Sequence, residues 1–125
     1  MKIAQYHEFG PPDVLKIEKT NRPKASAHEI VVRVKAVSVN PIDTMVRSGQ
    51  MKWLSGKKFP QSTGFDFAGE VIFTGKKVKR VSKKDEVFGY LPQLSRGSAA
   101  ELIKVPVEWV AMKPKNLSFE EAAAM

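Results

Sequence analysis

The polar residues best suited to chemistry gather in one short segment, residues 40–49. Asn40 stands before Pro41 at the expected start of a helix, where its side-chain amide can both donate and accept hydrogen bonds. Asp43 and Arg47 are four residues apart, a spacing that lets their charges pair on one helix face. Spacing alone favours an ordinary capped helix with a surface salt bridge, and a site built around Asn40 is the alternative.

A second candidate is Asp66, which stands between Phe65 and Phe67 in a segment predicted to be a buried strand. A carboxylate in such a place needs a partner, because an unpaired buried charge is costly. A structural ion pair with Arg47 or with a lysine is the favoured interpretation. The alternative is an acid that lines a cleft.

The residue types exclude several kinds of site. The chain of 125 residues has no cysteine, and its two histidines, His7 and His28, are far apart in the sequence. A disulfide scaffold, a thiol nucleophile and a thiolate zinc site are therefore excluded, and we predict no metal site. No two glycines are two positions apart, so the G-x-G-x-x-G dinucleotide fingerprint is absent.

The net charge of +8 comes mostly from one segment, Lys76 to Lys84, which holds six basic residues and no acid. A basic chain makes nucleic acid the first partner to consider. The segment has no aromatic residue on which bases would stack, so a solvated turn between strands is favoured. A nucleic-acid-binding module that uses this segment remains the alternative function.

Short strands separated by turns must position these residues, since eight glycines and eight prolines divide the chain. Strands are predicted over residues 2–6, 14–19, 29–39, 64–73, 86–90, 99–105 and 109–112, and residues 50–62 are expected to be irregular. The alternation in residues 29–39 slips by one near Ala36 and Val37, which predicts a β-bulge there. A second helix is predicted from Leu117, with Ser118 and Glu121 as a capping box. Only about two turns follow, too few for a stable helix, so we expect the chain to be the front part of a longer protein.

Five segments resemble, in order, those of the zinc-independent medium-chain dehydrogenase/reductases. Residues 37–43 with Arg47-Ser48-Gly49 resemble their N-P-x-D…R-x-G segment, and residues 59–71 resemble their P-x-x-x-G-x-D-x-x-G-x-V strand. Residues 84–89, 97–104 and 113–124 are similar to their K-x-G-D-x-V-F-G turn, their G-x-x-A-E strand and the link into their cofactor domain. Within this family the chain is most similar to quinone oxidoreductases and alkenal or enone reductases.

The resemblance implies a mainly β fold, a GroES-like partly open β-barrel with short helices, over residues 1–115. Residues 116–125 would begin a linker helix into a Rossmann domain beyond Met125. It also implies NADPH or NADH, bound mainly by that second domain, and hydride transfer without zinc to a quinone or an α,β-unsaturated carbonyl. Zinc-dependent relatives have a cysteine and a histidine where Asn40 and Phe65 stand in this chain.

The same resemblance assigns candidate site residues. It implies catalytic roles for Asn40, Asp43 and Arg47, cofactor contacts for Asn40, Phe65 and Asp66, and a substrate cleft lined by Met45, Met51 and Trp53. We expect a cytoplasmic protein that partners a small molecule and no membrane, a homodimer at full length, and an inactive monomer as the isolated chain. A co-chaperonin-like ring would rest on the fold alone.

Overall fold

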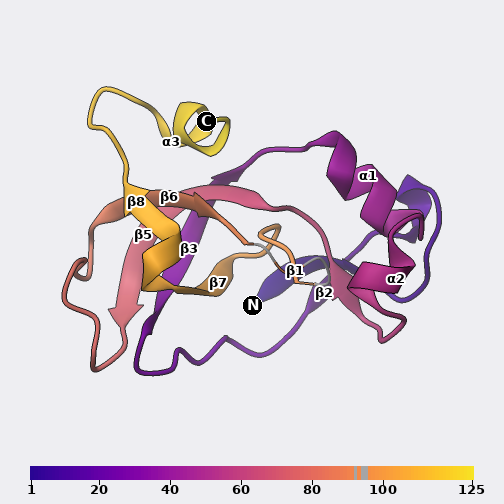
Figure 1. The fold of residues 1–125 in the computed structure, drawn as a ribbon, viewed down its shortest axis with the longest axis horizontal. Helices are drawn as coiled ribbons and strands as arrows, with labels where there is room; N and C mark the ends of the chain where they lie inside the picture. Colours follow the sequence, from indigo (N-terminus) through magenta and orange to yellow (C-terminus); the bar gives the residue numbers. More distant parts are fainter. Residues whose placement is uncertain (92, 94–95) are drawn as a thin grey trace.

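The fold consists of two antiparallel sheets, shown by a computed structural model that describes residues 1–91, 93 and 96–125 (Figure 1). The smaller sheet has the order β2-β1-β4 and the larger the order β7-β3-β5-β6-β8. Their strands are β1 (Lys2–Tyr6), β2 (Lys16–Lys19), β3 (Glu29–Val37), β4 (Gln61–Ser62), β5 (Asp66–Thr74), β6 (Glu86–Tyr90), β7 (Leu102–Pro106) and β8 (Val110–Met112). A bridge between Ile3 and Ala100 joins the two sheets. The predicted mainly β, partly open barrel is confirmed.

The core lies against one face of the larger sheet. Alternate residues of its strands point inward and are fully buried, among them Ile30 and Val32 of β3 and Phe67 and Val71 of β5. Burial of each such side chain contributes about 1.5–3 kcal/mol to folding. We call the opposite face of this sheet the outer face.

Three short helices flank the sheets: α1 (Pro41–Arg47), α2 (Lys52–Ser55) and α3 (Phe119–Ala123), with 3-10 turns at Pro12–Val14 and Val107–Trp109. Figure 1 shows α3 above the larger sheet, whereas α1 and α2 lie together at the other end of the molecule. On the outer face, Ala122 and Ala123 of α3 pack against Ala68 of β5. Within the described part of the chain, no helix has the length and apolar character needed to span a membrane.

The predicted capping box of α3 is confirmed. The Glu121 backbone N–H donates to Ser118 Oγ at 3.1 Å, and the Ser118 N–H donates to Glu121 Oε1 at 3.2 Å. Hydrogen bonding of the Glu121 carboxyl by Ser118, first by its backbone N–H and then by its side chain, holds the pKa of that carboxyl below its usual value. The helix start is therefore fixed by the pattern that the sequence displays.

Several predicted boundaries differ from the structure. Residues 50–62 are not wholly irregular, because they contain α2 and the two-residue strand β4. Residues 14 and 109, predicted as strand, belong to 3-10 turns instead. The register of β3 against β5 shifts between Val34 and Ala36, close to the predicted bulge, and also between Val31 and Val32. The alternation of residue types located the first shift but not the second.

The basic segment, residues 76–84, connects β5 to β6. Its lysines are exposed, but Val81 is buried and Arg80 donates to the Val110 carbonyl oxygen, so the segment is also attached to the core. Asp66 begins β5, whereas the basic segment follows the other end of that strand. The nine residues of β5 therefore separate Asp66 from the basic segment by about 25 Å. The solvated turn remains the favoured interpretation of this segment, and nucleic-acid binding remains the untested alternative.

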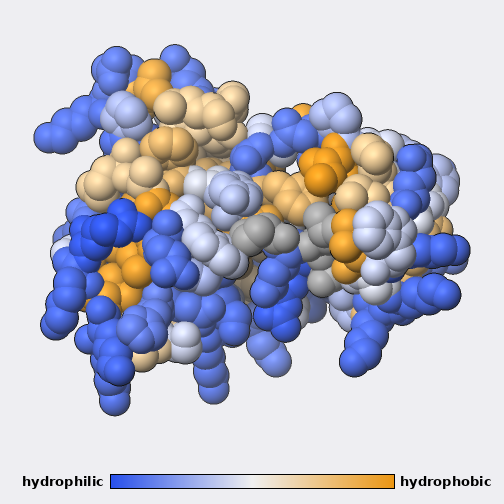
Figure 2. Space-filling model, viewed as in Figure 1, coloured by the Kyte–Doolittle hydropathy of each residue, from blue (hydrophilic) through white to orange (hydrophobic). Residues whose placement is uncertain are grey.

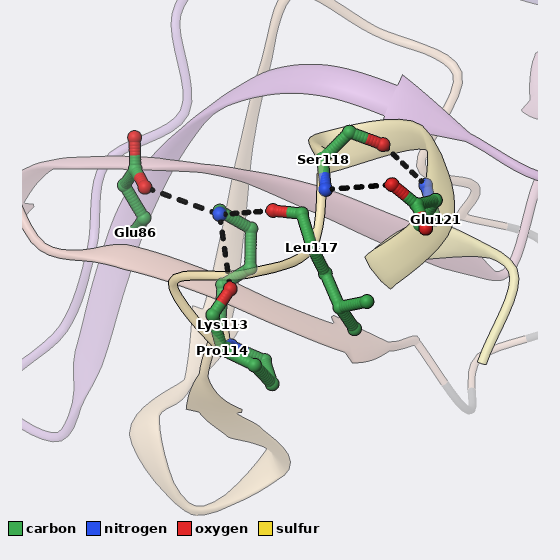
Figure 3. A network of polar contacts seen from close by, with 6 residues as sticks. All are labelled: Glu86, Lys113, Pro114, Leu117, Ser118 and Glu121. Carbon is green, nitrogen blue, oxygen red and sulfur yellow. Dashed lines mark hydrogen bonds and ion pairs between the residues drawn. The ribbon is translucent and has the colours of Figure 1, made fainter.

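A nearly buried lysine fixes the turn that leads from β8 to α3 (Figure 3). The Lys113 side chain is 5% exposed, and its Nζ lies 3.3 Å from Glu86 Oε1. Nζ also donates to the Leu117 and Pro114 carbonyl oxygens, at 2.6 and 3.2 Å. The Phe119 ring centroid lies 5.2 Å from the same nitrogen. All three N–H donors of the ammonium group are thus used.

We predict that Lys113→Met lowers the free energy of unfolding by about 1–3 kcal/mol, since two carbonyl groups and a carboxylate lose their donor. Urea unfolding measures the loss, and amide hydrogen exchange should accelerate most in α3. Lys115→Met is the matched control, because Lys115 is exposed. Equal stability of the two variants would contradict the role assigned to Lys113.

Candidate functional site

Three polar side chains meet where β3 ends and β5 begins. Asn40 Nδ2 donates to Asp66 Oδ2 at 2.7 Å, and Ser38 Oγ donates to the same oxygen at 2.9 Å. Asn40 Nδ2 also lies 3.3 Å from Ser38 Oγ. We call these three residues the Asp66 cluster. It forms because Asn40 is the N-cap of α1 in an extended conformation, with φ −124° and ψ 159°.

The carboxylate determines which way the Asn40 amide faces. An ionised carboxylate only accepts hydrogen bonds, so Asn40 must turn its NH₂ group toward Asp66. The NH₂ group then donates to Asp66 Oδ2, and its nitrogen lies 3.3 Å from Ser38 Oγ. The Asn40 side-chain carbonyl oxygen, an acceptor, is thereby turned away from the carboxylate.

Asp43 stabilises the cluster by accepting hydrogen bonds from two backbone N–H groups. Its side chain is 6% exposed. Oδ2 accepts the Asn40 backbone N–H at 2.7 Å, and Oδ1 accepts the Gly64 N–H at 3.0 Å. Gly64 has φ +94°, a conformation that favours glycine, in the turn just before β5. Asp43 therefore ties the start of α1 to the start of β5 and positions Asn40 against Asp66.

Arg47 is bonded elsewhere. Its Nε donates to the Gly10 carbonyl oxygen at 3.2 Å, and the Gly10 N–H donates to the Arg47 carbonyl oxygen at 3.0 Å. The predicted surface salt bridge between Asp43 and Arg47 is wrong, because Asp43 is buried and satisfied by backbone N–H groups. The predicted cation partner of Asp66 is also wrong, because an amide and a hydroxyl take that place.

A buried tyrosine lies behind α1. Tyr6 is 1% exposed, and its hydroxyl donates to Gln61 Oε1 at 3.1 Å. Burial raises the pKa of Tyr6, an effect that Arg47 opposes and Asp43 reinforces. The Gln61 amide in turn donates to the Gly56 carbonyl oxygen at 2.9 Å, which holds the end of α2. These contacts support the site without reaching the Asp66 cluster.

The Asp66 cluster lies on the outer face, beside the area that α3 covers. Side chains two residues apart on a strand share a face, so Asp66 shares the face of Ala68, against which α3 packs. Figure 2 shows the molecule hollowed between α3 and α1. In Figure 1 the segment from β3 to α1, which carries Ser38 and Asn40, runs between the part of the sheet under α3 and α1.

Residues 26–115 match the alcohol dehydrogenase GroES-like domain. The chain belongs to this family. Over its whole length it is 36% identical to a 2-methylene-furan-3-one reductase from Solanum lycopersicum, of which it covers 34%. The solved structure of the quinone oxidoreductase from Coxiella burnetii is similar with a TM-score of 0.95 and 34% identity, over the whole chain and 40% of that protein. That of Escherichia coli quinone oxidoreductase complexed with NADPH has a TM-score of 0.85 and 28% identity, over 99% of this chain and 36% of that one.

This GroES-like domain thus spans about a third of the length of the curated relatives that it matches. The resemblance to quinone oxidoreductase-like and alkenal reductase-like proteins, given by the sequence motifs, is confirmed over the whole chain. Two of the relatives, from Arabidopsis thaliana and Danio rerio, are NADPH-dependent or NAD(P)H oxidoreductases by name. These similarities establish the family of the domain. The activity of the whole protein that carries the domain is a separate question.

The other predicted site residues of the GroES-like domain form no side-chain hydrogen bond to the Asp66 cluster. Met45 on α1 is 40% exposed and Trp53 on α2 is 76% exposed, while Met51 is half-buried before α2. Phe65 is half-buried directly before Asp66, and its carbonyl oxygen accepts the Leu91 N–H at 2.8 Å. Their roles in cofactor and substrate binding stay predictions.

Two residues of the site were not predicted from the sequence, namely Ser38 and Gly64. A signal for Ser38 exists, since it is the polar residue that follows the break in alternation near Val37. In the residues that the structure describes, no three His, Cys, Asp or Glu side chains gather as metal ligands would. Zinc independence of this GroES-like domain stays a prediction.

Proposed function

We propose that the protein carrying this domain is an NAD(P)H-dependent oxidoreductase that reduces quinones or α,β-unsaturated carbonyls by hydride transfer, without zinc. The observation that supports this most directly is the Asp66 cluster. It holds the Asn40 side chain against Asp66 at the outer face of the larger sheet, in a domain whose relatives include quinone oxidoreductases and alkenal reductases.

The acceptor on Asn40 fits a reduced nicotinamide, whose carboxamide carries N–H donors. Asn40, Phe65 and Asp66 are the residues that would line its ring, and the bound cofactor would supply the hydride. The remainder of the cofactor would be held by a second domain, because this sequence has no G-x-G-x-x-G turn. We therefore propose that the isolated chain is inactive.

In the full-length protein, Asn40→Ala is expected to lower kcat/KM for quinone and enone reduction about tenfold, the effect of one lost hydrogen bond. Loss of reduced-nicotinamide absorbance with a quinone or an enone as acceptor measures it. Thr44→Ala serves as the control, since Thr44 is exposed on the same helix. An unchanged kcat/KM would remove Asn40 from the site, and turnover by the 125-residue chain alone would contradict the two-domain proposal.

A further inference from the structure

The donors of the Asp66 cluster are directed mainly at its own carboxylate. The Ser38 hydroxyl and the Asn40 NH₂ group both donate to Asp66 Oδ2. Reduction of a quinone or an enone builds negative charge on the carbonyl oxygen, and a donor aimed at that oxygen stabilises the charge. A neighbouring residue on the same face of the sheet can supply that donor.

Tyr90 stands beside the cluster on the same face of the sheet. It is the direct partner of Asp66 in the register of β6 against β5. Directly opposed residues of antiparallel strands project from one face, with Cβ atoms about 4.5–5.5 Å apart. The next pair of that face, Ala68 and Phe88, belongs to the patch that α3 covers. Tyr90 therefore borders the hollow next to Asp66, just beyond α3.

The Tyr90 hydroxyl is available to a ligand. Its side chain is 56% exposed, and it forms no side-chain hydrogen bond with the residues that the structure describes. The chain has one other tyrosine, Tyr6, whose hydroxyl is buried and bonded to Gln61. Of these two phenols, only Tyr90 can meet a substrate.

We propose that Tyr90 is the hydrogen-bond donor to the carbonyl oxygen of the substrate, an inference that rests on the proposed function. Asn40 and Tyr90 then have different roles at the site. Asn40 offers an acceptor, which suits the cofactor amide, and Tyr90 offers a donor, which suits the substrate.

The proton and electron balance of the step is simple. Hydride adds to the electron-poor carbon of the enone, the C=C electron pair moves toward the carbonyl group, and the oxygen takes the charge. The Tyr90 hydroxyl gives its proton to that oxygen, and water returns a proton to the exposed phenolate. The enol then becomes the saturated ketone by proton exchange with solvent. With a quinone, the same hydride and proton give the hydroquinone.

The first test needs no turnover. Cyclohex-2-enone labelled with ¹³C at the carbonyl is bound to the full-length protein with oxidised cofactor, and the carbonyl stretch is measured by infrared difference spectroscopy. The wild type is expected to shift the stretch to lower frequency, and Tyr90→Phe is expected to lose the shift. Tyr6→Phe is the matched control and should keep it, because Tyr6 is buried away from the hollow. A shift that survives in Tyr90→Phe would overturn the assignment.

The second test is kinetic. Tyr90→Phe is expected to lower kcat/KM for the enone roughly 100-fold, as the loss of one such donor does, with the KM for NADPH unchanged. Tyr90→His, which keeps an N–H donor, should recover part of both the rate and the infrared shift, and it guards against a folding defect in the phenylalanine variant. If the wild type is active and Tyr90→Phe equals it, the inference fails while the proposed function stands. If the wild type reduces neither acceptor but shows a Tyr90-dependent carbonyl shift, the proposed function fails while the donor role is supported.

Discussion

Replacement of Asp43 with alanine is expected to lower the free energy of unfolding by about 4 kcal/mol. The reason is that the backbone N–H groups of Asn40 and Gly64 lose their common acceptor, and each unsatisfied donor costs about 1–3 kcal/mol. The helix α1 also loses the negative charge in its first turn, which the helix dipole favours. Urea unfolding monitored by fluorescence measures the change.

The control for this variant is Asp13→Ala. Asp13 also lies in the first turn of a short helix, but it is exposed, so its loss should change stability by less than about 0.5 kcal/mol. In the full-length protein, Asp43→Ala should reduce activity too, because Asn40 would no longer be held against Asp66. Matching unfolding midpoints for the two alanine variants would show that Asp43 does not carry these bonds.

The helix starts could be predicted because the interactions that form them are local. Asn40 and Pro41 mark the start of α1, and Ser118 with Glu121 marks the start of α3. The hydrogen bonds that form these two helix starts join residues only three positions apart. The elements α2 and β4 could not be predicted in this way. They have four and two residues, and they exist through distant contacts, such as the pairing of β4 with Gln5 and Tyr6 of β1.

Three residues of the site could be named from the sequence, but their partners could not. Asn40, Asp43 and Asp66 were all candidates. Each carboxylate was expected to pair with a cation, since Arg47 stands four residues from Asp43. In the structure the partners are Ser38, 28 residues from Asp66, and the Gly64 backbone, 21 residues from Asp43. The β3–β5 pairing brings these groups together. Patterns among residues that are close in the sequence do not predict this pairing.

That pairing depends on Gly69, and Gly69→Ala is expected to destabilise the protein by about 4 kcal/mol or more, the range that signals a severe packing or backbone conflict. A Cβ at this position would overlap the Arg33 carbonyl oxygen and lie 2.8 Å from Val32 Cγ1. Strand β3 cannot move aside freely, because β7 holds its other edge. Thermal unfolding followed by circular dichroism measures the loss.

Gly56→Ala separates this steric effect from the general cost of losing a glycine. Gly56 has φ +81° and ψ 179°, but a Cβ there meets nothing within 4 Å, so its replacement should cost only the backbone strain, about 1–3 kcal/mol. The close approach of β3 and β5 at Gly69 is also what brings the end of β3, with Ser38, to Asp66 three residues away along β5. A Gly69→Ala protein that still folds should therefore show a changed NMR signal for the Asn40 side-chain amide, whereas Gly56→Ala should not. If Gly69→Ala is no less stable than Gly56→Ala, the strands do not approach as closely as the structure shows, and the geometry of the Asp66 cluster loses its support.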